Sequence, residues 1–259
     1  MPSTYAHYRF GAAMLPVMPA DIRRTVKRFR QLYDVGLHGP DIFFYYNPVI
    51  STKIGSLGHK FHMQSGEDFF QRVCRLLRLD PSEAANAYLY GVLTHYCLDA
   101  VMHPFISEKA AQGIAAHKQI ESEFDRYLLQ IDGKTPPCTQ DLSPHIRLTP
   151  GECETTARFY PGATAKHLRD GVRNMAFITK LLATPEGTKR TLLEKTLSVK
   201  SADRLLIPAA PDPACSHLDE ALLGLYRDAE ALFPTLLMQL NAHLTYNAPL
   251  GESFAPVFG

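Results

Sequence analysis

The fold is decided by residues 80–125, which run DPSEAANAYLYGVLTHYCLDAVMHPFISEKAAQGIAAHKQIESEFD. Asp80 is a good N-cap residue, Pro81 suits the first helical position, and Glu83 completes a capping box. These signals predict a long helix that starts at Asp80. Because proline disfavours helical backbone in the residue before it, we expect this helix to end just before Pro104.

Side chains that bind metals recur along this stretch at helical spacing. His95, Asp99 and His103 lie at i, i+4 and i+8, which places them on one face of the long helix. A second helix, expected to end near residue 130, carries His117 and Glu121, again four residues apart. The pattern predicts two helices that form the wall of a metal site.

Chance and geometry both bear on this interpretation. With 11 His and 26 acidic residues, about one His–acid pair at this spacing is expected by chance, so one pair alone is no evidence. The alternative is a helix whose histidines are ordinary core or surface groups. At about 1.5 Å rise per residue, His95 and His103 are roughly 12 Å apart along the axis, too far to share one ion. Asp99 lies between them and could bridge, so the spacing favours a cluster of ions.

Composition limits the class of protein. The chain has 259 residues, 46% of them hydrophobic, and a formal net charge of +1, enough for one large domain or two small ones. This balance argues against disorder and, weakly, against nucleic acid as a partner. No apolar run is long enough to span a membrane, and no signal peptide is visible. The five cysteines form no CxxC pair, so we expect reduced thiols in a cytoplasmic protein.

Elsewhere the pattern is helical, and we expect an all-α, multi-helix single domain. Residues 1–135 would form a metal-binding helical core, and residues 136–259 a helical part packed on the same domain, after a proline-rich stretch at 131–150. Apolar periodicity predicts further helices at 4–15, 20–33, 65–79, 164–183, 188–198 and 216–243.

Residues 35–64 show little helical periodicity and are expected to form a loop that lines a site. This loop holds Asp41 and two candidate ligands, His59 and His62. Its aromatic side chains could line a pocket for a lipid glycerol, a nucleobase or a choline-like headgroup, or could be ordinary core residues. The candidates for substrate contact are Phe44, Tyr45 and Tyr46.

Residues 5–125 resemble the bacterial zinc-dependent phospholipase C family, which shares an all-helical fold with the P1-type nucleases. The resemblance is carried by motifs spread along this half of the chain. They are His95-Tyr96…Asp99…His103-Pro104, His117…Glu121…Asp125, the Gly39-Pro40-Asp41 turn, His62 before the helix that starts at Gly66, and an early His7.

The resemblance implies three zinc ions. The first would be held by Asp41, His62, His95 and Asp99, and the second by His103, His117 and Glu121. The third would use His7, Asp99 and the amino and carbonyl groups of the N-terminal residue. Members of the family are secreted and expose an N-terminal Trp after processing, whereas this chain has no Trp.

The residues and the resemblance together predict a zinc-dependent phosphodiester hydrolase of the phospholipase C type. Two or three ions would bind phosphate oxygens and activate a water molecule. Asp41 could bind metal, accept a proton from that water, or both. The substrate would be a lipid or small-molecule phosphodiester. The alternatives are a nuclease or nucleotidase of the P1 type, and a metal-stabilised helical domain that binds a partner without catalysis.

Overall fold

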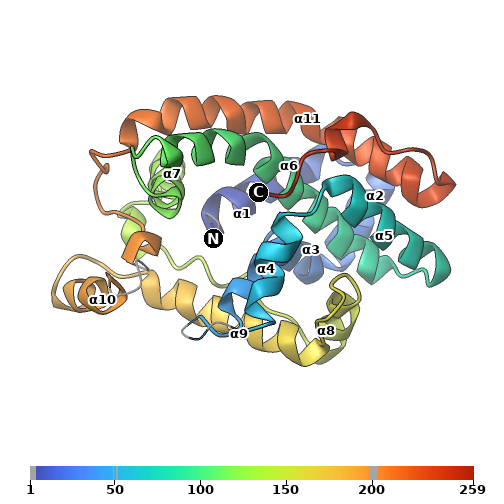
Figure 1. Ribbon diagram of the computed structural model, residues 1–259, viewed down its shortest axis with the longest axis horizontal. Coiled ribbons are helices and arrows are strands. Elements are labelled where there is room, and N and C mark those ends of the chain that lie inside the picture. Colours follow the sequence, from blue (N-terminus) through green and yellow to red (C-terminus); the bar gives the residue numbers. More distant parts are fainter. Residues whose placement is uncertain (1–3, 49, 51, 199–202) are drawn as a thin grey trace.

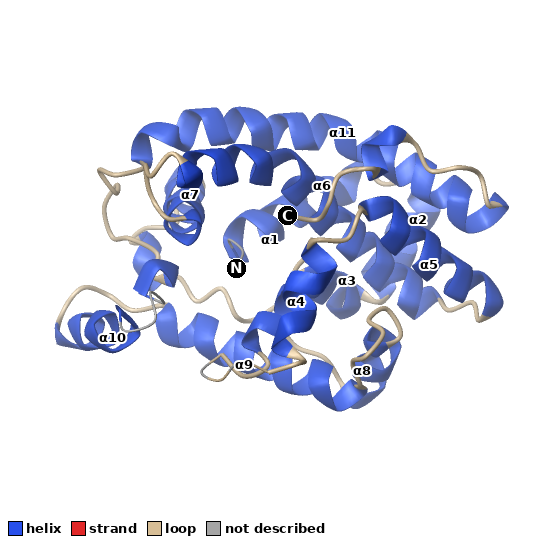
Figure 2. Ribbon diagram, viewed as in Figure 1, coloured by secondary structure: helices blue, strands red, loops and turns tan. Residues whose placement is uncertain are grey.

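The computed structural model describes residues 4–48, 50, 52–198 and 203–259. Within these ranges, α-helices and 3-10 helices form all of the regular structure except one isolated bridge, so the expected all-α fold is confirmed (Figure 2). The α-helices are α1 (Thr4–Met14), α2 (Ala20–Arg28), α3 (Arg30–Gly36), α4 (Gly55–His62), α5 (Gly66–Leu79), α6 (Glu83–Ala111), α7 (His117–Ile131), α8 (Pro150–Ala157), α9 (Ala165–Leu182), α10 (Thr188–Ser198) and α11 (Asp219–Tyr246). The 3-10 helices are η1 (Leu15–Val17), η2 (Gly39–Tyr45), η3 (Pro137–Thr139), η4 (Asp203–Leu205), η5 (Ser216–Leu218) and η6 (Glu252–Phe254).

Helix α6 is the centre of the fold and is buried along most of its length. It packs against α3 and α11, and Figure 1 shows α11 running alongside it. The crossing with α3 depends on two glycines. A Cβ on Gly91 would lie 2.3 Å from the Tyr33 carbonyl oxygen, and one on Gly36 would lie 2.9 Å from the Gly91 Cα. This close approach fixes the position of α6.

Both predicted ends of the long helix are wrong. The N-cap is Ser82, whose hydroxyl accepts a hydrogen bond from the Ala85 N–H, while Asp80 ends α5. At the other end the helix continues through Pro104 to Ala111. A proline inside a helix removes one backbone hydrogen bond, and burial of the next turn against the core compensates for that loss here.

Other differences are local. The helix expected at 20–33 is two helices, because Phe29 has a non-helical backbone (φ −114°, ψ 42°). The predicted loop at 35–64 is also wrong in part, since it contains η2 and α4. Helix α8 was not predicted, although Thr149 and Glu152 form a capping box at its start.

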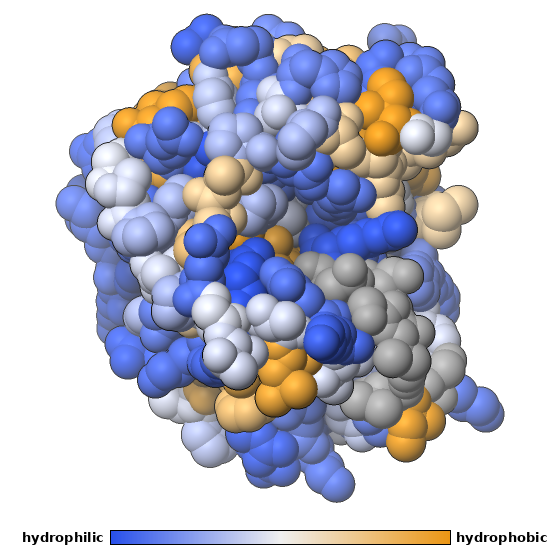
Figure 3. Space-filling model, turned by 90° about the vertical axis from the view of Figure 1, so that its left-hand side faces the viewer, coloured by the Kyte–Doolittle hydropathy of each residue, from blue (hydrophilic) through white to orange (hydrophobic). Residues whose placement is uncertain are grey.

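The C-terminal part packs directly on the N-terminal part. Helix α11 lies on α5 and α6, and α9 lies on η2, where the Asn174 amide donates to the carbonyl oxygens of Tyr45 and Tyr46. A boundary at 135/136 stays a prediction. In the described ranges, no helix is both long enough and apolar enough to cross a membrane. The face in Figure 3 is mainly hydrophilic, with its visible apolar side chains in small separate groups.

Candidate metal centre

The candidate ligands come together from α6 and four helical elements around it. Helix α6 supplies His95, Asp99 and His103 from one face, as the spacing predicts. Helix α7 adds His117 and Glu121. Three further elements supply one ligand each: α1 supplies His7, η2 supplies Asp41 and α4 supplies His62. Three groups of ligand atoms result, and within each group the atoms lie within 4.8 Å of one another.

The first group contains Asp41, His62 and His95. The His62 Nε2 lies 2.9 Å from the Asp41 Oδ1, while its Nδ1 donates to the Gly58 carbonyl oxygen at 2.7 Å. The Nδ1 of His95 similarly faces the Leu37 carbonyl oxygen at 3.2 Å. Such backbone contacts fix the tautomer and leave Nε2 available to a metal.

The turn that carries Asp41 requires a glycine. Gly39 has a positive φ of 44°, and a Cβ at this position would lie 2.6 Å from the Cδ2 of His95. Only glycine combines this backbone conformation with so close an approach. The Gly39-Pro40-Asp41 turn therefore sits directly against the imidazole of a candidate ligand.

The second group contains His7, His95 and Asp99. The Asp99 Oδ1 lies 3.1 Å from the His7 Nε2 and 3.4 Å from the His103 Nε2, and its Oδ2 lies 3.1 Å from the His95 Nε2. The rings of His7 and His95 are stacked, with centroids 4.5 Å apart. Asp99 thus faces imidazoles on both sides, in the position of a bridging carboxylate.

The third group contains His103, His117 and Glu121. The Glu121 Oε1 lies 3.3 Å from the His117 Nε2 and 3.5 Å from the His103 Nε2. This group is nearer to solvent, because the side chain of His117 is 31% exposed and that of His103 is 13% exposed. His95 is completely buried.

Several polar atoms in the two inner groups are buried without a hydrogen-bond partner in the described part of the chain. They include the Oδ2 atoms of Asp41 and Asp99, the Nε2 of His95 and the Nδ1 of His7. His95 Nε2 and Asp99 Oδ2 are close but lack hydrogen-bond geometry. Because such atoms are costly to bury, they fit a centre completed by bound cations.

The electrostatics of the cluster favour ionised carboxylates. Burial raises the pKa of Asp99, but His103, His95 and His7 outweigh it and hold that pKa well below its usual value. The pKa of Asp41 is also lowered, because His62 and His95 outweigh burial. Burial lowers the pKa of His103, whereas Asp99 and Glu121 raise it to about 9.

The remaining predicted residues are placed as follows. His59 is exposed on α4, packs on Phe44 and is in none of the three groups. Phe44 also packs on His62, while Tyr46 packs on His167. The N-terminal residue, whose amino and carbonyl groups the resemblance places at the third ion, lies outside the described residues. The assignment of the ligands stays a prediction.

Two contacts of the site were not predicted. His38 is fully buried, and its Nε2 lies 2.8 Å from that of His145. No spacing signal connects these two residues. Asp125 accepts hydrogen bonds from the backbone N–H groups of Tyr5 and Ala6 and so holds the start of α1. Its position four residues after Glu121, on the same face of α7, was the available signal.

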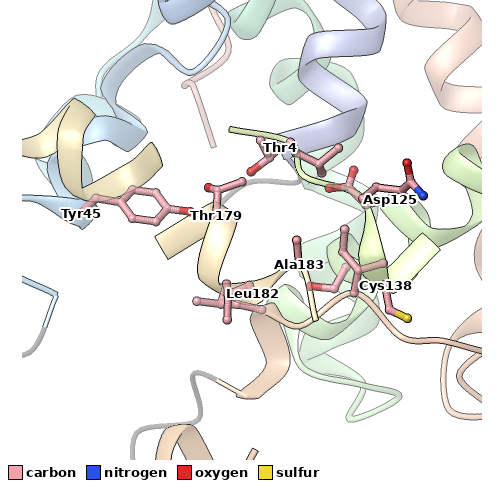
Figure 4. Close-up of a pocket in the computed structure, with 12 residues that line it drawn as sticks. Thr4, Tyr45, Asp125, Cys138, Thr179, Leu182 and Ala183 are labelled. Carbon is pink, nitrogen blue, oxygen red and sulfur yellow. The ribbon is translucent and has the colours of Figure 1, made fainter. Parts of the chain in front are cut away.

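A pocket is lined by residues that follow candidate ligands in the sequence, although none of the eight candidate ligands lines it (Figure 4). Its cavity volume is about 40 Å³, and it opens to solvent. Tyr45 lines the pocket at the end of η2, four residues after Asp41, and Asp125 lines it four residues after Glu121. The other lining residues are Thr4, Ser122, Cys138, Gln140, Leu142, Thr179, Leu182, Ala183, Leu205 and Ile207. The C-terminal part therefore contributes one side of the pocket.

Fold and site together define an all-α protein with a candidate centre for several metal ions. Comparison with known families agrees with this class. The zinc-dependent phospholipase C family matches residues 6–161, more than half of the chain, and the chain belongs to that family. The match includes all eight candidate ligands. No curated protein and no solved structure matches the chain.

Proposed function

We propose that this protein is a zinc-dependent hydrolase of the phospholipase C type, which cleaves the phosphodiester of a phospholipid or a related substrate with water. The observation that carries the proposal is the convergence of three ligand groups around Asp99 in a member of this family. A phosphodiester carries its negative charge on two non-bridging oxygens, which suits a centre of several cations.

The donor set fits zinc. Imidazole nitrogens and carboxylate oxygens are usual zinc ligands, and the unpartnered buried atoms of Asp41, His95 and Asp99 point to cations that complete their coordination. When bound, such ions stabilise charge on the phosphate oxygens and lower the pKa of a bound water. We assign the inner ions to His7, Asp41, His62, His95 and Asp99, and the outer ion to His103, His117 and Glu121.

Asp41 is the candidate base. One of its oxygens faces His62, and the other has no hydrogen-bond partner among the described residues. The carboxylate is ionised at neutral pH and so able to accept a proton, while its lowered pKa makes it a weaker base than an ordinary Asp. Asp41 can also be a metal ligand. The two roles differ in whether an Asp41→Asn variant would retain its zinc.

The pocket in Figure 4 is our candidate for the part of the site that holds the substrate beyond its phosphate. Hydroxyl, amide and carboxylate groups line it together with apolar side chains such as Leu182, Leu205 and Ile207. This mixture suits a glycerol ester or a polar headgroup better than a long acyl chain. Of the three aromatic residues that the sequence suggested for substrate contact, Tyr45 lines the pocket, whereas Phe44 and Tyr46 do not.

The test is hydrolysis of a short-chain phosphatidylcholine by the zinc-loaded protein, with single-stranded DNA as the competing substrate. We expect release of the phosphorylated headgroup, and at least about a 100-fold loss of kcat in Asp41→Asn. If the variant retains its zinc, Asp41 acts as a base; if it also loses zinc, Asp41 is a ligand. Cleavage of DNA but not of phospholipid would favour the P1-type alternative. Zinc binding with no hydrolysis of either substrate would contradict the proposal.

A further inference from the structure

The C-terminal segment, residues 252–259, lies outside the family match and yet reaches the candidate metal centre. After α11 the chain turns back, passes along α5 and α6, and ends beside the last residue of α4 (Figure 1). No motif in the sequence indicates a role for it.

Two phenylalanines anchor this segment in the core. Phe254 and Phe258 are both fully buried. Phe254 stacks on Tyr96 of α6, with centroids 5.9 Å apart and an interplanar angle of 7°, and Phe258 packs edge to face on the same ring at 4.9 Å. Both also contact Phe70 of α5. A segment with two buried aromatic rings is held firmly in place.

Backbone hydrogen bonds fix the register of the segment. The N–H groups of Phe258 and Gly259 donate to the carbonyl oxygens of Gln64 and His62, at 3.3 and 3.2 Å. In the opposite direction, the Gly66 N–H donates to the Pro256 carbonyl oxygen at 2.9 Å. The C-terminal segment therefore runs antiparallel to the residues that join α4 to α5.

This register brings the segment against three candidate ligands. Gly259 holds the backbone of His62, and the ring of Phe258 lies 6.2 Å from that of His95. Gly259 also lies against the Nδ1 edge of His103, the ring edge opposite the Nε2 that faces Asp99 and Glu121. The segment thus contacts a member of each of the three ligand groups.

The contact with His103 leaves no space for a side chain. A Cβ on Gly259 would lie 1.8 Å from the Nδ1 of His103 and 2.4 Å from its Cε1. The ring cannot turn away freely, because its Nε2 is within 3.5 Å of both Asp99 and Glu121. Any side chain at position 259 would therefore displace either the segment or the imidazole.

We propose that the C-terminal segment is a positioning element of the metal centre, and that Gly259 sets the place of the His103 imidazole in the outer group. Partners behind a ligand commonly change metal affinity by about 10–100-fold. The inference rests on the proposed function only through its metal centre, so it concerns zinc affinity rather than hydrolysis.

The experiment compares Gly259→Ala with wild-type protein in zinc titrations against a competing chromophoric chelator. We expect the outer ion to bind about 10–100-fold more weakly, with the inner ions and the thermal stability of the metal-free protein unchanged. The matched control is Gly224→Ala on α11, because a Cβ there meets nothing within 4 Å. Gly259→Val enlarges the clash and should weaken zinc further.

A second titration tests whether Gly259→Ala acts through the outer ion. In a His117→Ala background, where the outer ion is already lost, Gly259→Ala should change zinc affinity little. The proposal would be overturned if Gly259→Ala bound zinc as tightly as wild type and Gly224→Ala do. It would also be overturned if Gly259→Ala weakened zinc binding just as much in the His117→Ala background. Wild-type protein that binds no zinc would overturn both this inference and the metal centre. Zinc binding without hydrolysis would overturn the proposed function alone.

Discussion

The inner and outer parts of the metal centre differ in burial, although both depend on the same helix. The side chains of the five inner ligands are at most 9% exposed, whereas those of His103 and His117 in the outer group are 13% and 31% exposed. A buried cluster of ionised groups without metal is costly to maintain. The difference predicts that inner ions would belong to the folded core, while an outer ion could exchange and meet substrate.

Removal of the metal ions should have the largest effect of the changes that test this difference. Chelation of all ions should abolish hydrolysis and lower the melting temperature by about 10 °C, since a ligand at 1,000 times its Kd adds about 4 kcal/mol to stability. Added zinc should restore both. Differential scanning calorimetry with and without a chelator is the measurement; an unchanged melting temperature would mean that the inner groups are stable without ions.

His95→Ala should have the largest effect of any single ligand substitution, because His95 belongs to two of the three groups. We expect about two ions fewer per chain and at least about a 10³-fold fall in activity, which corresponds to about 4 kcal/mol of lost transition-state stabilisation. Elemental analysis and kinetics provide the readouts. A variant that lost only one ion would show that His95 is not shared.

His117→Ala should have a smaller effect on zinc content and activity than His95→Ala. The residue is partly exposed and belongs to one group, so the variant should lose a single ion and keep the metal-free stability of wild type within about 0.5 kcal/mol. We expect activity to fall, with the inner ions retained. Urea unfolding and zinc content measured on the same samples check this, and simultaneous loss of all ions would erase the distinction between inner and outer parts.

The smallest effect concerns the His38–His145 pair beside the inner groups. Burial, with a contribution from Arg30, lowers the pKa of His145 to about 4, against 6.5 in an unfolded chain. The unfolded state then binds more protons between these values, so stability is lost as pH falls from about 6.5 to about 4. Between pH 7 and pH 5, metal-free wild type should lose roughly 4–7 °C more in melting temperature than His145→Gln. Equal losses would mean that His145 does not titrate in this way.

The sequence was most informative where one helix carries the pattern. His95, Asp99 and His103 share a face because helical geometry fixes their spacing, and the same holds for His117 and Glu121. Local signals were misleading where tertiary packing decides. Pro104 is accommodated inside α6 by the core around it, and Ser82 caps the helix while Asp80 ends the one before.

Contacts between distant segments could not be predicted from one sequence. The pairing of His38 with His145 joins residues 107 apart, and nothing in either local stretch indicates it. The approach of Gly259 to His103 depends on a register set by Phe254, Phe258 and the turn after α4. Neither periodicity nor capping rules specify such a register.

The most direct test of the whole account is the zinc content of the wild-type protein, measured by elemental analysis after zinc loading and removal of excess metal. We predict two or three zinc ions per chain, because the ligand atoms form three groups around Asp99, two of which share His95. No bound zinc, or a single ion per chain, would contradict a multinuclear centre and with it the proposed hydrolysis of phosphodiesters.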